Sequence, residues 1–174
     1  MTTQIMIDLE TYSILPNSAI ASIGACKFTL DNVENPILDT FYVNVEQSSN
    51  KKINRHYHKD TLDWWKTKPL EVKKALMENQ VSIEEAITKL CDFIKTENDP
   101  KIWSQGTDFD ISILKSTMFE LNIKEPWKYY NVRCSRTLAE IMGIKMLNYR
   151  SPGHHNALQD AIDQAKVVNM ILKT

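Results

Sequence analysis

The sequence predicts an α/β fold in which a mixed β-sheet is flanked by helices. Three strand-like apolar runs follow one another closely near the N-terminus, and strand and helix patterns alternate after them. The length of 174 residues, with 43% apolar and 25% charged residues, is ordinary for one compact domain with a sizeable core. We therefore expect a single domain over residues 1–174.

Strand patterns dominate the first part of the chain. The first three strands are expected at residues 4–8, 21–30 and 40–45. In the third, Phe41, Val43 and Val45 show the period-two alternation of a half-buried strand. Pro16 and turn-forming neighbours predict a loop before the second strand. Because no helical pattern separates these strands, an antiparallel meander is expected.

Helical spacing predicts most of the later elements. One helix carries Trp64 and Trp65, and Pro69 opens the next. Ser82 and Glu85 form a capping box before a third helix. One further strand and three further helices are expected at residues 101–105, 110–121, 135–142 and 156–172. The apolar stripe of the last helix is expected at Ala157, Ala161, Ala165, Val168 and Leu172.

Composition narrows the class of protein. No apolar run approaches the length of a membrane span, and the first residues lack the regions of a signal peptide. The odd cysteine count, without Cys-x-x-Cys spacing, favours a reduced compartment over a disulfide or zinc framework. These cysteines are Cys26, Cys91 and Cys134. We expect a cytoplasmic protein with no membrane partner.

Charge is unevenly distributed along the chain. The net charge of −1 argues against a protein that coats nucleic acid. Residues 51–74, however, hold eight basic against three acidic side chains, and residues 124–150 hold six against two. Two basic surfaces beside an acidic centre suit a polyanionic substrate, although solvated faces would give the same pattern.

Four acids and one histidine stand out against this background. Asp8 and Glu10 interrupt an apolar strand, and their spacing of two places both side chains on one face. Asp110 lies where a strand gives way to a helix, and Asp160 lies one turn inside the last helix, just after His155. In an open α/β sheet such junctions gather at one edge, where ligands bind.

These residue types together indicate phosphoryl chemistry. An isolated buried carboxylate is costly, so acids from three apolar segments suggest shared Mg²⁺ or Mn²⁺ ions. A pair of such ions offsets the mutual repulsion of the acids. A histidine adds a base with an ordinary pKa near neutrality for the attacking water. The set is complete for hydrolysis of a phosphodiester bond.

The motifs in this order resemble the DEDDh branch of DnaQ-like 3′→5′ exonucleases, which have a ribonuclease H-like fold. The Asp-x-Glu motif matches Asp8-Leu9-Glu10, the Phe-Asp motif matches Phe109-Asp110, and the His-x₄-Asp motif matches His155 to Asp160. The resemblance covers nearly the whole chain. It is strongest to small bacterial and phage exonucleases with an Asp-Thr-Leu-x-Trp-Trp segment, which is found here at residues 60–65.

The resemblance implies roles for these residues. The metal ligands would be Asp8, Glu10, Asp110 and Asp160, with His155 as general base. Two Mg²⁺ ions are implied, for which Mn²⁺ would substitute, and the reaction would be 3′→5′ hydrolysis of single-stranded RNA or DNA to nucleoside 5′-monophosphates. A homodimer is also possible. Substrate contacts are expected at Thr11, Tyr12, Phe109 and His154. One departure concerns substrate contact, since Gly106 replaces an Asn that is common in the family.

Several residues compete for these roles. Asp108 is an alternative to Asp110 or a cap of the helix that follows, and His154 is an alternative to His155. His56 and His58 form a His-x-His pair that is more typical of a loop than of a metal site. Adjacent tryptophans cannot share a helix face, so at least one of the pair at 64–65 belongs to the core.

Two other functions remain open from the sequence. The first is a binding module or polymerase-associated module without activity, against which the intact set of five residues argues. The second is an endonuclease with two metal ions on the same fold.

Overall fold

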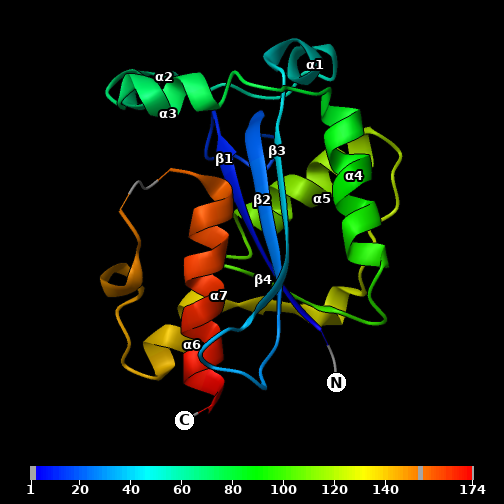
Figure 1. Cartoon of the computed structure of the whole chain (residues 1–174). Helices are drawn as coiled ribbons and strands as arrows, with labels where there is room; N and C mark the ends of the chain where they lie inside the picture. The colour runs from blue at the N-terminus through cyan, green and yellow to red at the C-terminus, as the bar shows by residue number, and fades with distance from the viewer. Residues whose placement is uncertain (1–2, 153–154, 174) are drawn as a thin grey trace.

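A computed structural model describes residues 3–152 and 155–173. Its centre is a mixed five-stranded sheet in the order β3-β2-β1-β4-β5 (Figure 1). The antiparallel meander and the mixed sheet predicted from the sequence are both confirmed, and β4 and β5 run parallel to β1. The strands are β1 Gln4–Thr11, β2 Ile20–Phe28, β3 Ile37–Asn44, β4 Lys101–Ser104 and β5 Val132–Cys134.

The described part of the chain contains seven α-helices and two short 3₁₀ helices. The α-helices are α1 Gln47–Lys52, α2 Lys59–Lys66, α3 Leu70–Ala75, α4 Ile83–Lys95, α5 Asp110–Glu120, α6 Ser135–Ile141 and α7 Ala157–Lys173. The 3₁₀ helices are η1 Tyr129–Asn131 and η2 Met146–Tyr149. None of the described helices is both long and apolar enough to span a membrane.

Several short elements were not predicted, for local reasons. Helix α1 has no apolar stripe, because its buried residues are Ser49 and Asn50. Strand β5 has three residues and the 3₁₀ helices are similarly short, so periodicity is absent there. The predicted cap of α4 is confirmed, since the backbone N–H of Glu85 donates to Ser82 Oγ at 3.2 Å.

Alternation along β1 divides the molecule into layers. Ile5, Ile7 and Leu9 face a core shared with α4 and α5. Met6 faces the opposite side, where the small residues of α7 pack. In Figure 1 helix α7 lies against one face of the sheet, with α4 and α5 on the other. Asp8 and Glu10 have the parity of Met6, so their carboxylates lie on the α7 side.

The packing of α7 corrects one prediction. Ala157, Ala161, Ala165 and Val168 are fully buried as expected, but Leu172 is 44% exposed and Ile171 is buried instead. A helix with 3.6 residues per turn returns closer to the same face after 14 residues than after 15. The predicted apolar stripe is therefore wrong at its last residue, where Ile171 takes the buried position instead of Leu172.

A glycine in β2 allows α7 to touch the sheet directly. Gly24 pairs with Asp8 in the β1–β2 ladder. A Cβ placed on Gly24 would lie 2.1 Å from the carbonyl carbon of Ala157 and 2.2 Å from the backbone nitrogen of Leu158. Because these are backbone atoms at the start of α7, no side-chain rotation relieves the overlap. Gly24 therefore sets the distance between the first turn of α7 and the centre of the sheet.

Replacing Gly24 with Ala should destabilise the protein by about 2–4 kcal/mol, because the added methyl group must push the start of α7 away from β2. Urea denaturation checks this, and Gly143→Ala is the matched control. Gly143 has φ +67°, and a methyl group added there would have nothing within 4 Å, so that change should cost only about 1 kcal/mol of backbone strain. Equal losses in both variants would contradict the close approach.

Candidate active site

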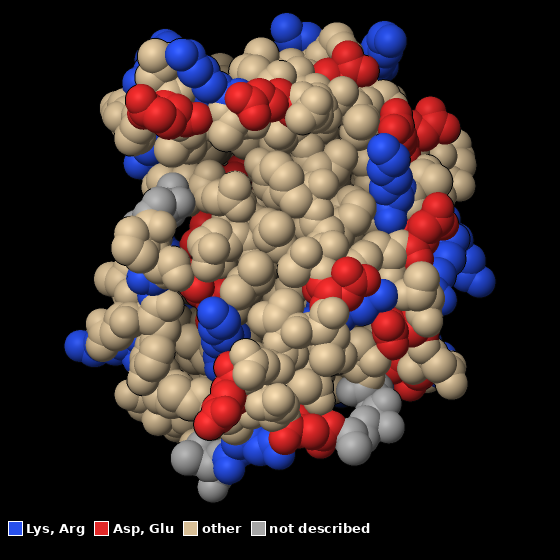
Figure 2. All heavy atoms as spheres, viewed as in Figure 1, with Lys and Arg blue, Asp and Glu red and all other residues tan. Residues whose placement is uncertain are grey.

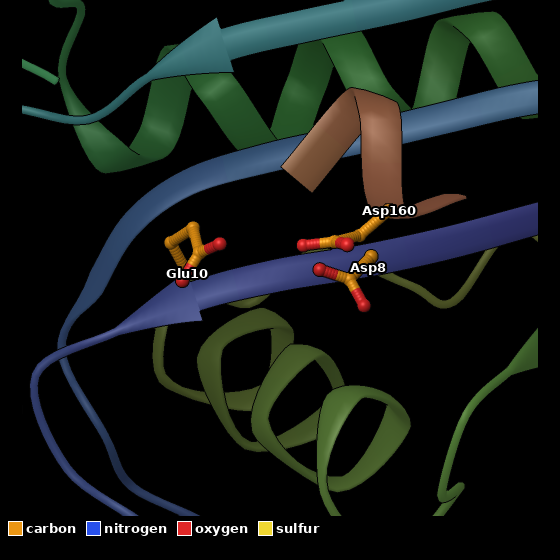
Figure 3. Close-up of side chains that lie close together, drawn as sticks. All are labelled: Asp8, Glu10 and Asp160. Carbon is orange, nitrogen blue, oxygen red and sulfur yellow. The ribbon is translucent and has the colours of Figure 1, made fainter. Parts of the chain in front are cut away.

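Three carboxylates meet at the carboxyl-terminal end of β1. Asp8 and Glu10 extend from the strand and Asp160 from the first turns of α7, and all three point toward one another (Figure 3). One oxygen from each lies within 4.8 Å of the others. Within residues 3–152 and 155–173, this is the only group of three or more His, Cys, Asp or Glu side chains that close together. Oxygen ligands at this spacing suit a hard divalent cation.

Asp110 approaches the same place from the other side of β1. It is the first residue of α5, is 3% exposed, and its Oδ1 accepts the backbone N–H of Leu9 at 3.1 Å. Its charge acts on Asp8, whose pKa it raises. Asp108 is exposed, and Phe109 rather than Asp108 occupies the N-cap position without a side-chain cap. The structure therefore favours Asp110 over Asp108 as the fourth acid, and the predicted cap by Asp108 is wrong.

Burial and mutual repulsion make the acids hard to ionise. The pKa of Asp8 is raised well above its ordinary value, first by burial and then by Asp110 and Glu10. Burial, followed by Asp160 and Asp110, raises the pKa of Glu10 to about 8. Burial raises the pKa of Asp110 to about 7, against the lowering effect of the Leu9 N–H. A cluster of this kind needs protons or cations to be stable, so its chemistry fits divalent metal ions.

One further residue at the cluster was missed in the sequence. Gln164 lies one turn after Asp160 on α7, is 5% exposed, and its Nε2 donates to Asp8 Oδ1 at 2.8 Å. This hydrogen bond orients the Asp8 carboxylate and lowers its pKa. The spacing of four between Asp160 and Gln164 was the available signal, because such residues share a helix face.

His155 stands just before α7, and its ring lies near both tryptophans of α2. Its backbone has φ +77°, a left-handed conformation that costs energy for a non-glycine residue. The ring packs edge-on against Trp64, with centroids 4.7 Å apart and planes at 87°. Lys68 Nζ lies 3.8 Å from the centre of the Trp64 ring. The competing residue, His154, lies outside the described residues.

The two tryptophans of α2 are placed differently. Trp65 is 5% exposed, and its Nε1 donates to the carbonyl oxygen of Thr11 at 2.8 Å. Trp64 is 40% exposed. The prediction that at least one of them is in the core is confirmed. Helix α2 is thus anchored to the end of β1 by Trp65, which leaves Trp64 to face His155.

A pocket of about 440 Å³ lies beside the acids, beneath α2. Its wall includes four apolar residues: Leu9, Ile14, Trp64 and Phe109. Polar groups complete it: Glu10, Thr11, Ser13, His58, Asp60 and Thr61. In Figure 2 acidic atoms are visible at the bottom of a recess below the α2–α3 pair. The volume and mixed lining suit one nucleoside.

Only some of the residues predicted to contact substrate line this pocket. Thr11 and Phe109 line the pocket. Tyr12 is 6% exposed and packs in a separate core with Trp65, stacked on Tyr57 with ring centroids 5.5 Å apart. Its burial in this core does not support a substrate contact, and Tyr12 is not among the residues that line the pocket.

The histidine pair at 56 and 58 is not part of the acid cluster, although His58 lines the pocket beside it. His56 Nδ1 is hydrogen-bonded to Ser13 Oγ at 2.8 Å, and the two imidazole centroids are 6.1 Å apart. Neither histidine belongs to a group of three potential ligands among the described residues. The loop interpretation of this pair agrees with these contacts.

Basic side chains from both charged stretches reach the site. Lys68, from the first stretch, and Arg150, from the second, each lower the pKa of Glu10. Arg136, also from the second stretch, lowers the pKa of Asp110. On the face shown in Figure 2, basic and acidic groups are otherwise interspersed. These three cations are therefore arranged around the acids and not in a separate binding patch.

Residues 3–172 match the family of Rv2179c-like 3′→5′ exoribonuclease domains. The chain belongs to this family. It is a 3′→5′ exonuclease, as the sequence predicted. Over 164 residues it is 27% identical to an exodeoxyribonuclease of Enterobacteria phage T4, in a match that covers 79% of this chain and 70% of the phage protein.

Solved structures confirm the ribonuclease H-like fold. The nuclease domain of 3′hExo, a DEDDh family member solved with rAMP bound, superposes with a TM-score of 0.65 at 15% identity, over 98% of this chain and 92% of the other. Exonuclease I from Methylocaldum szegediense gives a TM-score of 0.70 at 12% identity. That match covers 98% of this exonuclease but only 40% of exonuclease I. DEDDh exonucleases depend on divalent metal ions, and the acid cluster here fits that dependence.

The metal-free exonuclease should lose stability as the pH rises from about 5 to 8. Folded-state pKa values of about 8 for Glu10 and about 7 for Asp110 exceed the ordinary values, so the folded state binds more protons than the unfolded state in this range. That stability is present below the unfolded pKa and is lost as the pH passes the folded values. Melting temperatures in EDTA should fall by about 2–4 °C for each kcal/mol lost.

Divalent ions should reverse this trend at pH 8, because they bind the ionised acids of the folded state. Mg²⁺ or Mn²⁺ should raise the melting temperature at pH 8 more than at pH 5. A flat pH profile in EDTA, or equal metal effects at both pH values, would contradict the electrostatics described for the cluster.

Proposed function

We propose that this exonuclease cleaves single-stranded nucleic acid from its 3′ end and releases nucleoside 5′-monophosphates, using two Mg²⁺ ions for which Mn²⁺ substitutes. The observation that carries the proposal is the convergence of three carboxylates from β1 and α7, with Asp110 hydrogen-bonded to the backbone of β1 between Asp8 and Glu10. A protein that only binds nucleic acid has no use for a buried acidic cluster, which repels phosphates. This argues against an inactive module.

The proposed ligands are the four acids Asp8, Glu10, Asp110 and Asp160. When bound, the ions supply positive charge that stabilises the phosphorane-like transition state and the leaving oxygen. The chain holds the ligands in place through the Leu9 N–H to Asp110 and the Gln164 amide to Asp8. Because these partners are backbone or α7 atoms, the acids are oriented before any ion arrives.

We assign His155 as the general base that takes a proton from the attacking water. The imidazole sits at the entry to α7, on the same side of the sheet as Asp160, and packs against Trp64. A base must be held within reach of the water in a productive orientation. The edge-on contact with Trp64, together with the fixed backbone of α7, limits how far the ring can turn.

The pocket under α2 receives the 3′-terminal nucleoside in this proposal. Phe109 and Leu9 offer apolar surface for a base, and Glu10 at the pocket edge places the acids next to the bond to be cleaved. A base enters such a pocket only after leaving its stack, which favours single strands over duplexes. Both RNA and DNA are proposed as substrates, since the family is described by RNA cleavage and the phage T4 relative by DNA cleavage.

The remaining parts of the proposal concern the whole protein. We propose that residues 1–174 act as one exonuclease domain in the cytoplasm, where the three cysteines stay reduced, as their free thiols suggest. A homodimer is proposed from the family resemblance alone. Analytical ultracentrifugation tests it directly.

Digestion of matched single-stranded RNA and DNA, labelled at the 5′ end, tests the function. Products should shorten one nucleotide at a time with Mg²⁺, and EDTA should abolish the reaction. Asp8→Asn and Asp110→Asn should each lower the rate by at least about 10³-fold, since both remove a charged ligand, while Asp108→Asn should keep full activity. Internal cleavage, or near-normal turnover by Asp8→Asn, would refute the proposal.

His155→Ala should lower kcat by roughly 10²–10⁴-fold, the usual contribution of a general base. Metal-dependent stabilisation should persist in this variant, because the acids are intact. His56→Ala is the matched control and should retain activity, because His56 is not among the residues that line the pocket or the acid group. A loss below tenfold for His155→Ala would move the base role to another residue.

A further inference from the structure

An arginine occupies the space above a glycine in the loop between β4 and α5. Gly106 has φ +119°, a conformation that side-chain-bearing residues rarely adopt. A Cβ built on Gly106 would meet the guanidinium of Arg136, with Nη1 at 3.5 Å and Cζ at 3.6 Å. A long basic side chain from α6 therefore fills the space above Gly106.

The guanidinium of Arg136 is held by a hydrogen bond and has further N–H donors available. Nη2 donates to the carbonyl oxygen of Gln105 at 3.0 Å. Among the described residues this is its only hydrogen bond, and no carboxylate forms an ion pair with it. A guanidinium carries five N–H donors, so most of its donors are open to a further acceptor. The Arg136 residue is exposed, which leaves those donors accessible.

The position of this arginine relates it to the acidic centre. It lies against Gly106 and Gln105, in the loop that leads to Asp110, and so at the edge of the cluster. Gln105, to which it is bonded, lines a small cavity together with Asp160 and Arg150. The proposed nucleoside pocket reaches the same loop at Phe109 but lies under α2. Arg136 is therefore at the rim of the site, on the β4 side and outside the pocket.

We propose that Arg136 binds a phosphodiester group of the substrate strand on the 5′ side of the bond that is cleaved. This rests on the proposed function, because it assumes that the 3′ end lies in the pocket. The acids at the centre repel the strand, so its backbone must find positive charge at the rim. A planar guanidinium held at one nitrogen presents a pair of N–H groups to a phosphate in a defined direction. Gly106 leaves room for it.

The contact would not depend on the sugar or the base. A phosphate is the same in RNA and DNA, so Arg136 would contribute equally to both. It would raise affinity and hold the strand in register without distinguishing sequences. The choice between the two sugars then falls to the pocket.

Arg136→Gln tests the proposal, with Arg136→Lys as the charge-preserving variant and Arg133→Gln as matched control. The Arg133 guanidinium donates to the carbonyl oxygens of Tyr130 and Val132, away from the acids. Binding of a fluorescein-labelled single strand is measured by anisotropy in EDTA, at several salt concentrations. Arg136→Gln should weaken binding about tenfold and reduce the salt slope by about 0.7, the value for one phosphate on a single strand.

Kinetics separate binding from the chemical step. Arg136→Gln should raise KM about tenfold and change kcat by less than about threefold. Arg136→Lys should restore the salt slope but only part of the affinity, since an ammonium lacks the paired geometry. A fall in kcat with an altered Mg²⁺ requirement, at unchanged KM, would show that Arg136 acts only through Asp110 and would overturn the proposal.

Substrates with one neutral methylphosphonate linkage identify the phosphate. At the linkage that Arg136 contacts, the neutral group should weaken binding of the wild-type exonuclease but not of Arg136→Gln, as in a double-mutant cycle. Additive effects at every linkage, or an unchanged KM and salt slope in Arg136→Gln, would refute the contact. Such a result would leave intact an exonuclease that still shortens its substrate, whereas failure of the proposed function would appear as no shortening by the wild type.

Discussion

The contact between the start of α7 and the middle of β2 is the constraint on which the site depends. Gly24 has no side chain, so the backbone at Ala157 reaches the sheet without an intervening layer. This brings Asp160 within range of Asp8 on the neighbouring strand. A larger side chain at this point would push the helix away from the sheet, and the three carboxylates would no longer lie within reach of one cation. The geometry of the acid cluster is thus a consequence of backbone packing.

The same packing makes ionisation of the clustered carboxylates unfavourable. Asp8 is half-buried and Asp110 is buried; burial raises the pKa of both, and the charges of Asp110 and Glu10 raise the pKa of Asp8 further. The cost is offset by the apolar core on either side of the sheet, where α4 and α5 pack on one face and α7 on the other. Arrangements of this kind exchange stability for affinity toward cations, which is common at catalytic sites.

Positive charge is placed around this centre from separate elements. Lys68 follows α2, Arg136 lies on α6 and Arg150 lies between η2 and α7. The overall charge of −1 hides this arrangement, because acidic and basic residues nearly cancel over the whole chain. A substrate strand would thus meet basic side chains at the rim and acids only at the centre. Lys68 from the first basic stretch and Arg136 and Arg150 from the second act on acids of the same cluster.

Local periodicity determined much of this protein from sequence alone. Spacing by two placed Asp8 and Glu10 on one face, and helical spacing located α4, α5 and α7 to within a few residues. Periodicity could not choose between Asp108 and Asp110. That choice depends on which carboxylate is buried against β1, where Asp110 accepts the backbone N–H of Leu9. Spacing by four from Asp160 points to Gln164 as a neighbour on the same helix face but not to its contact with Asp8, 156 residues away in the chain, and no periodicity points to Gly24 or Arg136. Only tertiary packing decided those contacts, since they depend on how separate elements approach one another.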